Sequence, residues 1–317
     1  MKEKILYIVV PCYNEEEVLK ETTKRLKEKL SNLIKRKKIS KNSRVMYVND
    51  GSSDNTWNII KETNNKEKLF TGISLSKNRG HQNALLAGLM TAKKYADIVI
   101  SMDADLQDDI NAIDEMLEEY YKGNDIVYGV RNSRKKDTFF KRFTAETFYK
   151  IMRFMGLEII YNHADYRLAS KKVLDELEKY EEVNLFLRGI FPLIGYKSSI
   201  VYYERAERFA GKSKYPLKKM ISFAWEGVTS FTIKPLKIIM NTGLIISLLS
   251  FIFLIKVIID KYIGNNITGW TTIIVLICLF SGIQIFCIGI IGEYIGKIYI
   301  ESKKRPRYCV EEELPNK

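Results

Sequence analysis

The chain has 317 residues, enough for one large domain and a smaller additional segment. Its formal net charge of +13 at pH 7 indicates an anionic partner, which could be nucleic acid, anionic lipid or a phosphorylated substrate. The four cysteines show no metal-ligand spacing and two lie in an apolar segment, which disfavours a disulfide framework and fits a reducing compartment. The apolar run Ile5–Val10 is too short for a signal-peptide core, so we expect the N-terminal part to stay in the cytosol.

Apolar runs alternate with helix-spaced patterns over the first part of the chain. The expected strands are Ile5–Val10, Arg44–Val48, Phe70–Leu75, Ile98–Met102 and Asp125–Val130. The expected helices contain Val18 to Leu33, start at a cap on Asp54, and cover Gln82–Lys94 and Ile110–Lys122. This alternation predicts a mainly parallel sheet covered on both faces. The first strand is followed by neither a Gly-x-Gly-x-x-Gly motif nor a Walker loop, which disfavours ordinary dinucleotide-binding and P-loop folds.

Two carboxylates follow the fourth expected strand. Asp103 and Asp105 come directly after Ile98–Met102. A strand that ends this way directs both side chains at the carboxyl edge of its sheet, where open α/β sheets bind ligands. Paired aspartates there suit a hard divalent cation shared with the phosphates of a nucleotide. A solvated turn is the alternative for an isolated Asp-x-Asp, but the neighbouring strand ends favour the metal.

Polar clusters also end the first three strands. Pro11 to Glu15 form a proline-fixed turn that can lay backbone against a nucleobase while a carboxylate reaches its ribose. Asp50 follows the second strand and can contact the edge of uracil or guanine. The segment around Arg79 supplies cationic and amide groups before a helix, whose N-terminus favours anions. These clusters indicate a nucleotide site at one edge of the sheet.

Two later segments mix aromatic and basic residues. Residues 131–155 fit either a buried helix pair or a basic, aromatic surface against lipid headgroups. From Tyr215 to Ile233, apolar residues recur at helical spacing after Lys218 and Lys219, and the segment leads directly into a long apolar stretch. We therefore expect an interfacial helix there.

The C-terminal third contains two candidate transmembrane helices, Ile239–Ile259 and Trp270–Ile291. The first would be roughly 31 Å long at ~1.5 Å per residue, enough to cross a bilayer. Lysines and arginines concentrate outside the pair, whereas the connecting loop carries one lysine, so both termini are expected in the cytosol. Anionic lipid attracts such juxtamembrane charges, which explains much of the basic excess. No nucleic-acid module is recognisable, so nucleic acid is not an expected partner.

Short motifs stand in a defined order along almost the whole chain. They are Pro11-Cys12-Tyr13-Asn14-Glu15, Asp50-Gly51-Ser52-Ser53-Asp54, Asn78-Arg79-Gly80, Asp103-Ala104-Asp105-Leu106-Gln107-Asp108, Asp165-Tyr166-Arg167-Leu168, Phe186-Leu187-Arg188-Gly189, Arg205-Ala206-Glu207-Arg208 with the residues up to Tyr215, and Gly292-Glu293-Tyr294-Ile295-Gly296. In this order, and with two terminal spans, they resemble the glycosyltransferase family 2 enzymes with the GT-A fold. More closely, they resemble the polyprenyl-phosphate glycosyltransferases, which include dolichyl-phosphate mannose synthases and bactoprenol glucosyltransferases.

The resemblance implies a role for each motif. Asp103 and Asp105 would bind Mg²⁺ or Mn²⁺ and the diphosphate of a UDP- or GDP-linked sugar. Asp165 would lie beside the anomeric carbon, where the family places a candidate base, so Asp165 and Asp105 are the expected catalytic residues. The remaining nucleotide-sugar contacts would come from Pro11, Tyr13, Glu15, Asp50, Arg79 and Gln107. The lipid phosphate would be clamped by Arg205, Arg208 and Lys214, since the planar fork of arginine pairs well with phosphate.

The predicted fold class is α/β, with a GT-A, Rossmann-like catalytic domain built on a mainly parallel sheet. We expect this cytosolic domain to cover residues 1–215 and to be followed by an interfacial amphipathic helix at 216–238. A two-helix transmembrane hairpin is expected at 239–298 and a cytosolic tail at 299–317. His81 and His163 match no ligand cluster and are expected to serve local hydrogen bonding.

The predicted reaction is the inverting transfer of a single sugar, with UDP-glucose as first choice, to polyprenyl (undecaprenyl) phosphate at the cytosolic membrane face. Leu185–Gly189 lacks the Gln and Trp of the Gln-x-x-Arg-Trp motif of processive synthases, which favours single transfer. One alternative is transfer to a lipid hydroxyl such as diacylglycerol, which would not need Arg205 and Arg208. Another is a catalytically silent membrane scaffold, whose mark would be loss of Asp103 or Asp105. The sugar, the polyprenol length and self-association into a homo-oligomer stay open.

Overall fold

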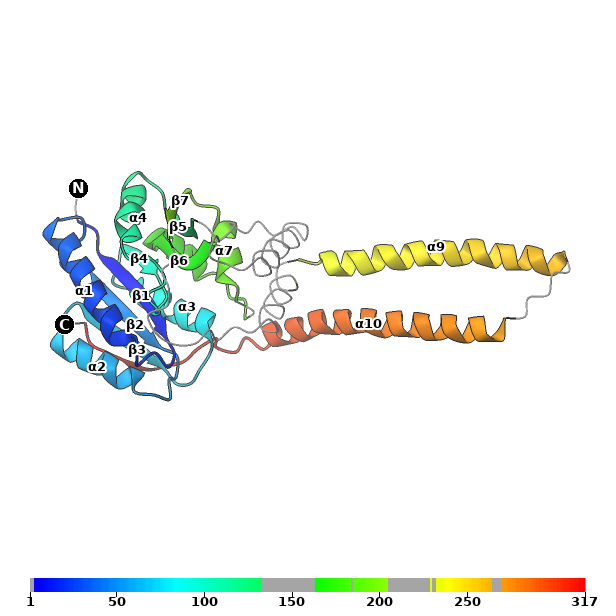
Figure 1. Cartoon of the computed structure of the whole chain (residues 1–317), viewed down its shortest axis with the longest axis horizontal. Helices are drawn as coiled ribbons and strands as arrows, with labels where there is room; N and C mark the ends of the chain where they lie inside the picture. Colours follow the sequence, from blue (N-terminus) through cyan, green and yellow to red (C-terminus); the bar gives the residue numbers. More distant parts are fainter. Residues whose placement is uncertain are drawn as a thin grey trace.

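The computed structural model describes residues 3–132, 163–183, 185–204, 229, 232–263 and 269–316. Figure 1 shows an α/β domain from which two long helices, α9 and α10, extend side by side as an arm. After the arm, the chain returns to the α/β domain, where it ends beside α2. The chain therefore joins the arm to the domain both before α9 and after α10.

The domain contains the strands β1 Leu6–Cys12, β2 Arg44–Asn49, β3 Phe70–Leu75, β4 Ile98–Ser101, β5 Ile126–Arg131, β6 His163–Ser170, β7 Ser198–Tyr203 and β8 Val310–Glu313. Its helices are α1 Leu19–Lys35, α2 Thr56–Lys66, α3 His81–Ala92, α4 Ala112–Tyr121, α6 Lys171–Leu177 and α7 Leu187–Ile194. The arm consists of α9 Lys234–Tyr262 and α10 Trp270–Ser302. The five strands expected from the sequence are confirmed, and β6, β7 and β8 are additional.

The strands form one sheet in the order β7-β5-β6-β4-β1-β2-β3-β8. The central strands β4, β1, β2 and β3 are parallel, and β5 and β7 are parallel to one another. β6 is antiparallel to both of its neighbours, and β8 is antiparallel to β3. The sheet is therefore mixed. Because β6 reverses direction between β4 and β5, these two strands run the same way, and only β6 and β8 depart from the predicted parallel arrangement.

Two apolar clusters pack on opposite faces of this sheet, as the period-2 alternation of a strand requires. In β1, Ile8 and Val10 belong to the cluster formed with α1, α2 and α4. Tyr7 and Val9 belong to the cluster formed with α3, α6 and α7. Helix α1 contributes a buried stripe at the spacing that the sequence indicated, namely Leu19, Thr22, Leu26, Leu30 and Leu33. The prediction of a sheet covered on both faces is confirmed.

Local details correct two of the sequence expectations. Asn55, not Asp54, is the N-cap residue of α2, and Asp54 instead accepts a hydrogen bond from the backbone N–H of Thr56 in the first turn. Strand β1 does not stop before Pro11 but continues to Cys12, because its pairing with β2 includes Pro11 and Cys12. The polar turn therefore begins at Tyr13.

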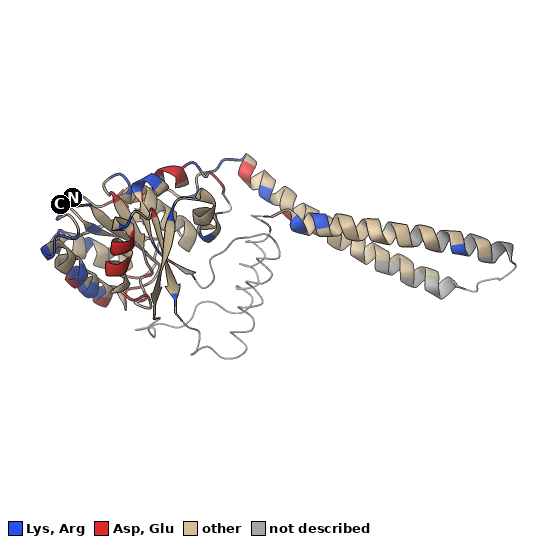
Figure 2. Cartoon of the chain, turned by 90° about the horizontal axis from the view of Figure 1, so that it is seen from above, with Lys and Arg blue, Asp and Glu red and all other residues tan. Residues whose placement is uncertain are grey.

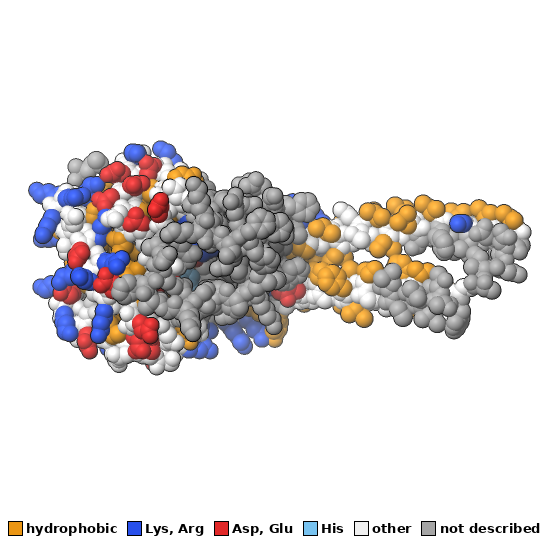
Figure 3. Space-filling model, in the orientation of Figure 1, with side chains coloured by type: hydrophobic (Ala, Val, Ile, Leu, Met, Phe, Trp, Pro, Cys, Tyr) orange, Lys and Arg blue, Asp and Glu red, His pale blue; other side chains and the backbone are white. Residues whose placement is uncertain are grey.

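The arm is largely apolar, and most of its described side chains are exposed. Charged residues are dense on the α/β domain and sparse on α9 and α10 (Figure 2), and hydrophobic side chains gather along the arm (Figure 3). Within the described part of the chain, one stretch, Phe280–Ser302, is long and apolar enough to cross a membrane by length and composition. The second expected span, Trp270–Ile291, lies within α10.

Several sequence predictions fall outside the described residues. They are most of the aromatic, basic segment 131–155, most of the interfacial helix at 216–238, and the phosphate clamp Arg205, Arg208 and Lys214. These predictions stay predictions.

Candidate active site

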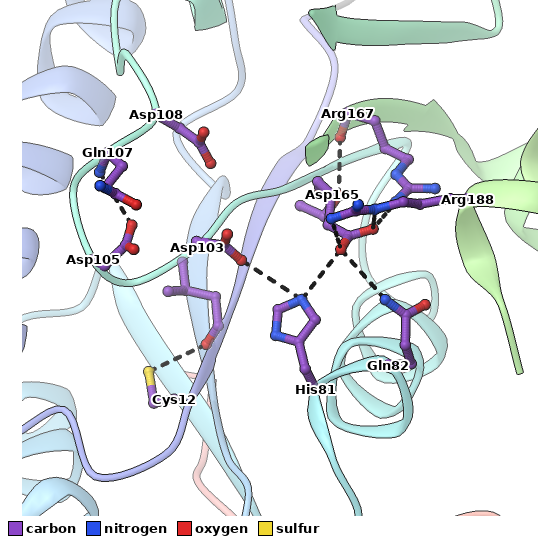
Figure 4. Close-up of polar contacts among 12 residues, drawn as sticks. Cys12, His81, Gln82, Asp103, Asp105, Gln107, Asp108, Asp165, Arg167 and Arg188 are labelled. Carbon is purple, nitrogen blue, oxygen red and sulfur yellow. Dashed lines mark hydrogen bonds and ion pairs between the residues drawn. The ribbon is translucent and has the colours of Figure 1, made fainter. Parts of the chain in front are cut away.

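The polar clusters that the sequence placed after strands meet at the carboxyl edge of the parallel strands β1, β2, β3 and β4. Asp50 follows β2, Arg79 lies in the loop between β3 and α3, and Asp103 and Asp105 follow β4. Asp165 lies within β6. Figure 4 shows His81 between Asp103 and Asp165, with Asp105 further along the loop that follows β4.

The antiparallel direction of β6 explains how Asp165 reaches the Asp103 motif. The β4–β6 register pairs Ile100 with Leu168 and Ser101 with Arg167. Two residues further along the same register, Asp165 stands opposite Asp103. The hydroxyl of Ser101 donates a hydrogen bond to the backbone carbonyl of Asp165 at 2.5 Å and fixes this end of the strand. The mixed sheet therefore brings two motifs together that are far apart in the sequence.

Asp165 is buried, with 5% of its surface exposed, and is surrounded by cationic and amide groups. Arg188 contacts both carboxylate oxygens, with Nε 3.3 Å from Oδ1 and Nη2 3.0 Å from Oδ2. The buried Arg167 also donates to Oδ1, and Gln82 donates to Oδ2 at 3.3 Å. A carboxylate with this many donors is fixed in orientation and in charge.

The electrostatics of Asp165 follow from these contacts. Burial would raise its pKa, but the charge of Arg188, the contact with His81 and the charge of Arg167 hold the pKa of Asp165 well below its usual range. The carboxylate is consequently ionised throughout the physiological pH range and is a poor proton acceptor.

His81 bridges the two acidic motifs. Its Nε2 atom lies 3.6 Å from Oδ1 of Asp103 and 3.6 Å from Oδ2 of Asp165 (Figure 4). Burial lowers the pKa of His81, but the hydrogen bond to Asp165 and the charges of both carboxylates outweigh this effect and raise it. A protonated His81 offsets part of the negative charge between the two aspartates.

Asp50 organises the loop between β3 and α3. Its two carboxylate oxygens accept hydrogen bonds from the backbone N–H of Arg79 at 2.7 Å and of Gly80 at 3.0 Å. Gly51 adopts φ +63°, and a Cβ atom there would lie 2.5 Å from the backbone nitrogen of Asn78. Burial raises the pKa of Asp50 although these backbone donors lower it. In this structure, Asp50 therefore shapes the loop that the sequence assigned to the nucleotide.

The loop after β4 has the features of a site for a hard cation. Leu106 has φ +58°, which turns the chain sharply, and the backbone N–H of Gln107 donates to Oδ1 of Asp105 at 3.1 Å. The side chain of Asp103 is 37% exposed and thus accessible to a ligand. No three His, Cys, Asp or Glu side chains within the described ranges could hold a metal ion together. Two carboxylates fit Mg²⁺ or Mn²⁺, since such ions take their other ligands from phosphates and water.

Asp108 forms a second buried cluster with two side chains from the far strands. Tyr203 at the end of β7 donates to Oδ1 of Asp108 at 2.5 Å, and Nη2 of Arg131 lies 3.9 Å from the same oxygen. Oδ2 of Asp108 is buried and has no hydrogen-bond partner among the described residues. Burial and the charge of Asp103 raise the pKa of Asp108 to about 6, although the Tyr203 hydrogen bond and the charge of Arg131 lower it.

The sequence singled out Asp165 but not the side chains that surround it. His81 was assigned to local hydrogen bonding, and Gln82 and Arg188 were not given a role of their own. His81 and Gln82 directly follow the ordered motif Asn78-Arg79-Gly80, and Arg188 lies within the motif Phe186-Leu187-Arg188-Gly189. These positions were the available signal. Tyr13, which the sequence placed at the nucleobase, is 41% exposed at the end of β1.

A cavity of about 1130 Å³ lies away from these residues, where α10 reaches the domain. It is lined by the loop 179–183, by Thr229, Thr232 and Ile233, and by the end of α10 with the following residues. Its charged lining is more basic than acidic, with Lys179, Lys297, Lys304, Arg305 and Arg307 against Glu181, Glu182 and Glu301. The acidic carboxyl-edge site and this basic cavity are separate features of the molecule.

Comparison with known proteins identifies the family of this chain. The model of the family described as glycosyl transferase family 2 matches residues 7–178, which is more than half of the chain and contains Asp50, Asp103 and Asp165. The chain belongs to glycosyl transferase family 2. A second model, the GtrB C-terminal hairpin, matches residues 234–298, which correspond to α9 and most of α10.

Full-length relatives place this glycosyltransferase in the bactoprenol glucosyltransferase group. It is 51% identical over 314 residues to the uncharacterized glycosyltransferase YkoT of Bacillus subtilis strain 168, covering 99% of this chain and 93% of the relative. It is 38% identical to the bactoprenol glucosyl transferase of Shigella phage SfV, covering 96% and 98%. It is 39% identical to a prophage bactoprenol glucosyl transferase homolog of Escherichia coli K12, covering 96% and 97%. The C-terminal hairpin and the apolar α10 indicate that the enzyme associates with a membrane.

Solved structures are more distant. Glucosyl-3-phosphoglycerate synthase from Mycobacterium tuberculosis, in complex with Mn²⁺ and UDP, has a TM-score of 0.45 at 14% identity, covering 71% of this chain and 78% of its own. TarS 1–349 of S. aureus in complex with UDP has a TM-score of 0.40 at 17% identity, covering 63% and 60%. Likenesses this remote assign no ligand to this chain.

Proposed function

We propose that this glycosyltransferase moves a single sugar from a nucleotide diphosphate donor, UDP-glucose in the first place, to polyprenyl phosphate, with inversion at the anomeric carbon. The acceptor would be undecaprenyl phosphate on the cytosolic leaflet. The observation that carries the proposal is the pairing of Asp103 with Asp165 through His81 at the carboxyl edge, in a chain that is 38% identical over its length to a bactoprenol glucosyl transferase.

The donor half of the site supports a nucleotide sugar. The loop held by Asp50 presents Arg79 and the N-terminus of α3 beside the acidic loop that follows β4. A helix N-terminus carries partial positive charge and favours phosphate oxygens. Tyr13 at the end of β1 exposes an aromatic ring that can stack on a base. Pro11, Glu15 and Gln107 belong to the same edge and complete the proposed donor contacts.

Asp103 and Asp105 would hold Mg²⁺ or Mn²⁺ against the donor diphosphate. Bound there, the ion would neutralise charge that develops on the departing nucleotide. His81 limits the repulsion between Asp103 and Asp165, so that both carboxylates stay ionised while they are close together. The exposure of Asp103 leaves room for phosphate oxygens and water to complete the coordination.

We assign Asp165 an orienting role. A phosphate monoester has a second pKa near ~6, so it is largely a dianion at neutral pH and attacks without losing a proton. A base is essential only for a hydroxyl acceptor. The low pKa of Asp165 and its pairing with Arg167 and Arg188 support a carboxylate that fixes neighbouring groups instead of taking up a proton.

The membrane half of the molecule supports a lipid acceptor. Helices α9 and α10 would form a transmembrane hairpin, with residues 1–215 and both termini in the cytosol and with 216–238 as an interfacial helix. The basic cavity at the end of α10 lies where the candidate span meets the domain, and its lysines and arginines suit an anionic headgroup. Arg205, Arg208 and Lys214 are the proposed clamp on the lipid phosphate itself.

Acceptor competition tests this function against its closest alternative. Purified enzyme in detergent receives UDP-glucose with Mg²⁺ and, separately, undecaprenyl phosphate, undecaprenol or diacylglycerol. The proposal expects UDP release only with the phosphorylated lipid. Turnover with undecaprenol or diacylglycerol at a comparable rate would show a hydroxyl acceptor. Turnover with none of these lipids, whichever nucleotide sugar is offered, would favour a silent scaffold.

A further inference from the structure

The last residues of the chain touch the donor half of the site. Strand β8 pairs with β3, matching Ile73 with Glu313, Ser74 with Glu312 and Leu75 with Val310. Just before β8, the backbone carbonyl of Cys309 accepts a hydrogen bond from the N–H of Ser76 at 3.0 Å. Ser76 is the first residue after β3, so the C-terminal segment reaches the base of the nucleotide loop, residues 76–80.

The C-terminal segment, residues 309–316, is held along its whole length. Nε1 of Trp57 donates to Glu312 at 3.0 Å, and Nζ of Lys61 lies 2.7 Å from the same carboxylate oxygen. Leu314 is buried, and its N–H donates to the carbonyl of Gly72 at 2.9 Å. Asn64 donates to the carbonyl of Pro315 at 3.1 Å. Contacts this numerous give the segment one position against β3 and α2.

The nucleotide loop is fixed from two sides. On its inner side, Asp50 holds the N–H groups of Arg79 and Gly80, and the Gly51 backbone packs against Lys77 and Asn78. On its outer side, the hydrogen bond to Cys309 holds Ser76. A short exposed edge strand rich in glutamate would suffice to protect the sheet edge. The contact at Ser76 goes further, because it constrains a loop that carries ligand-binding groups.

The same segment is also the continuation of the membrane helix. Helix α10 ends at Ser302, and β8 begins at Val310. Between them, Nη1 of Arg307 donates to the carbonyl of Tyr180 at 2.9 Å. In the last turn of α10, the carboxylate of Glu301 accepts from the N–H of Val183 at 2.8 Å. The path from the candidate span to Ser76 is therefore short and anchored to the domain at each step.

We infer that the C-terminal segment is a positioning element of the donor site, which couples nucleotide affinity to the docking of the membrane hairpin. Pairing with β3 fixes Ser76, and the fixed loop presents Arg79 and the N-terminus of α3 to the donor. A catalytic domain cut before the hairpin would lack β8 and bind the nucleotide weakly. This inference rests on the proposed donor site but not on the identity of the sugar or the acceptor.

The test compares UDP binding by calorimetry, in Mg²⁺, for the full chain and for a chain that stops after Tyr308. We expect the dissociation constant for UDP to rise about tenfold or more in the shortened protein, equivalent to roughly 1.4 kcal/mol. A synthetic peptide with the sequence of residues 308–317, carrying C309S because only the backbone of Cys309 makes the contact, should restore the affinity. The KM for undecaprenyl phosphate should differ from that of the full chain by less than about twofold. General unfolding would instead impair the use of both substrates.

Two point variants keep the test decisive if the shortened chain does not fold. Leu314→Ala removes buried contacts of the segment and should weaken UDP binding, whereas Glu311→Ala, at an exposed position of the same segment, should not. Equal UDP affinity in full-length, shortened and Leu314→Ala proteins would overturn the inference and leave the proposed function intact. Absence of UDP binding by the full chain would instead contradict the proposed donor site.

Discussion

Arg188 contacts both carboxylate oxygens of Asp165, at 3.3 Å through Nε and at 3.0 Å through Nη2. This two-point contact fixes the plane of the carboxylate and, with Arg167 behind it, keeps it charged. Asp165, the candidate base, is thus held as an ionised carboxylate that is paired with arginine. The predictions that follow depend on this arrangement and on the loops around it.

Asp165→Asn should slow turnover through misplacement, while the acidic limb of the pH profile persists. The pKa of Asp165 lies well below its usual range, so Asp165 does not supply a limb near pH 6. The second ionisation of the lipid phosphate falls there, as does the pKa of Asp108, about 6. The measurement is kcat/KM for polyprenyl phosphate against pH in both forms. Loss of that limb in the variant, with residual activity remaining, would identify Asp165 as the titrating base.

The same substitution should also lower stability, because it leaves Arg167 buried without its charged partner. Removing one member of a buried ion pair typically costs about 3–5 kcal/mol of unfolding free energy. The double variant Asp165→Asn with Arg167→Met should recover part of this loss, since the fully buried charge is removed with its partner and only the partly exposed Arg188 is left unpaired. Denaturant unfolding of the two variants compares them. Equal stability of the single variant and the wild type would show that the pair is not formed.

Asp105→Asn should abolish turnover while folding and membrane insertion stay intact, because the side chain is partly exposed and its proposed role is to bind the metal, not to make core contacts. Asp109→Asn, in the same acidic loop but outside the proposed ligand set, is the matched control and should stay active. Activity assays with and without EDTA, together with circular dichroism, provide the measurement. Full activity of Asp105→Asn, or of the wild type in EDTA, would remove the metal from the mechanism.

Gly51→Ala should raise the KM for the nucleotide sugar more than Gly80→Ala does. Both glycines have positive φ, so both substitutions carry backbone strain, on the order of 1–3 kcal/mol each. Only at Gly51 does a Cβ atom collide with the backbone of Lys77 and Asn78, whereas nothing lies within 4 Å of a Cβ at Gly80. The KM values from steady-state kinetics distinguish backbone strain, which is expected in both variants, from displacement of the loop, which is expected only in Gly51→Ala. Similar KM values for the two variants would mean that the Gly51 contact does not position the loop.

Asp108→Asn should stabilise the protein increasingly as pH rises. The pKa of Asp108 in the folded protein is raised from 3.8 to about 6. Ionisation of this carboxyl therefore destabilises the folded state, and the wild type loses stability as pH rises through this range. The advantage of the variant should grow by roughly 1 kcal/mol between pH 5 and pH 8, at about 1.36 kcal/mol per pKa unit. Thermal unfolding in EDTA at both pH values measures it. A constant difference would show that Asp108 is ionised at both.

Arg208→Ala should weaken the use of lipid phosphate more than the binding of nucleotide sugar. Loss of one charge-assisted contact costs on the order of 1.5–3 kcal/mol. The two KM values, determined side by side, provide the measurement. An unchanged KM for polyprenyl phosphate, with only donor binding reduced, would assign Arg208 to the other substrate.

The sequence predicted the features that depend on local patterning. The strands around Ile8 and Ile100, the buried stripe of α1 and the acidic turn after β4 follow from apolar periodicity and from the rule that ligands bind at the carboxyl edge. Strand β6 was not predicted, because His163–Ser170 carries buried polar residues, Asp165 and Arg167, where a central strand is normally apolar. These residues are tolerated there because each neutralises the other.

Features that depend on long-range contacts could not be predicted from the sequence. Nothing in the acidic stretch Val310–Glu313 indicates a strand, because its stability comes from Trp57, Lys61 and the open edge of β3. The bridge from His81 to Asp103 and Asp165 depends likewise on the direction of β6, which sequence periodicity does not fix.

The most direct test of the account is mass spectrometry of the lipid product. Membranes that contain the enzyme, or its Asp105→Asn variant as control, are incubated with undecaprenyl phosphate, Mg²⁺ and a panel of labelled UDP- and GDP-sugars. The account predicts one new lipid whose mass equals undecaprenyl phosphate plus a single hexose, formed from UDP-glucose by the wild type alone. Label on diacylglycerol, label on chains of several sugars, or no labelled lipid with any donor would contradict it.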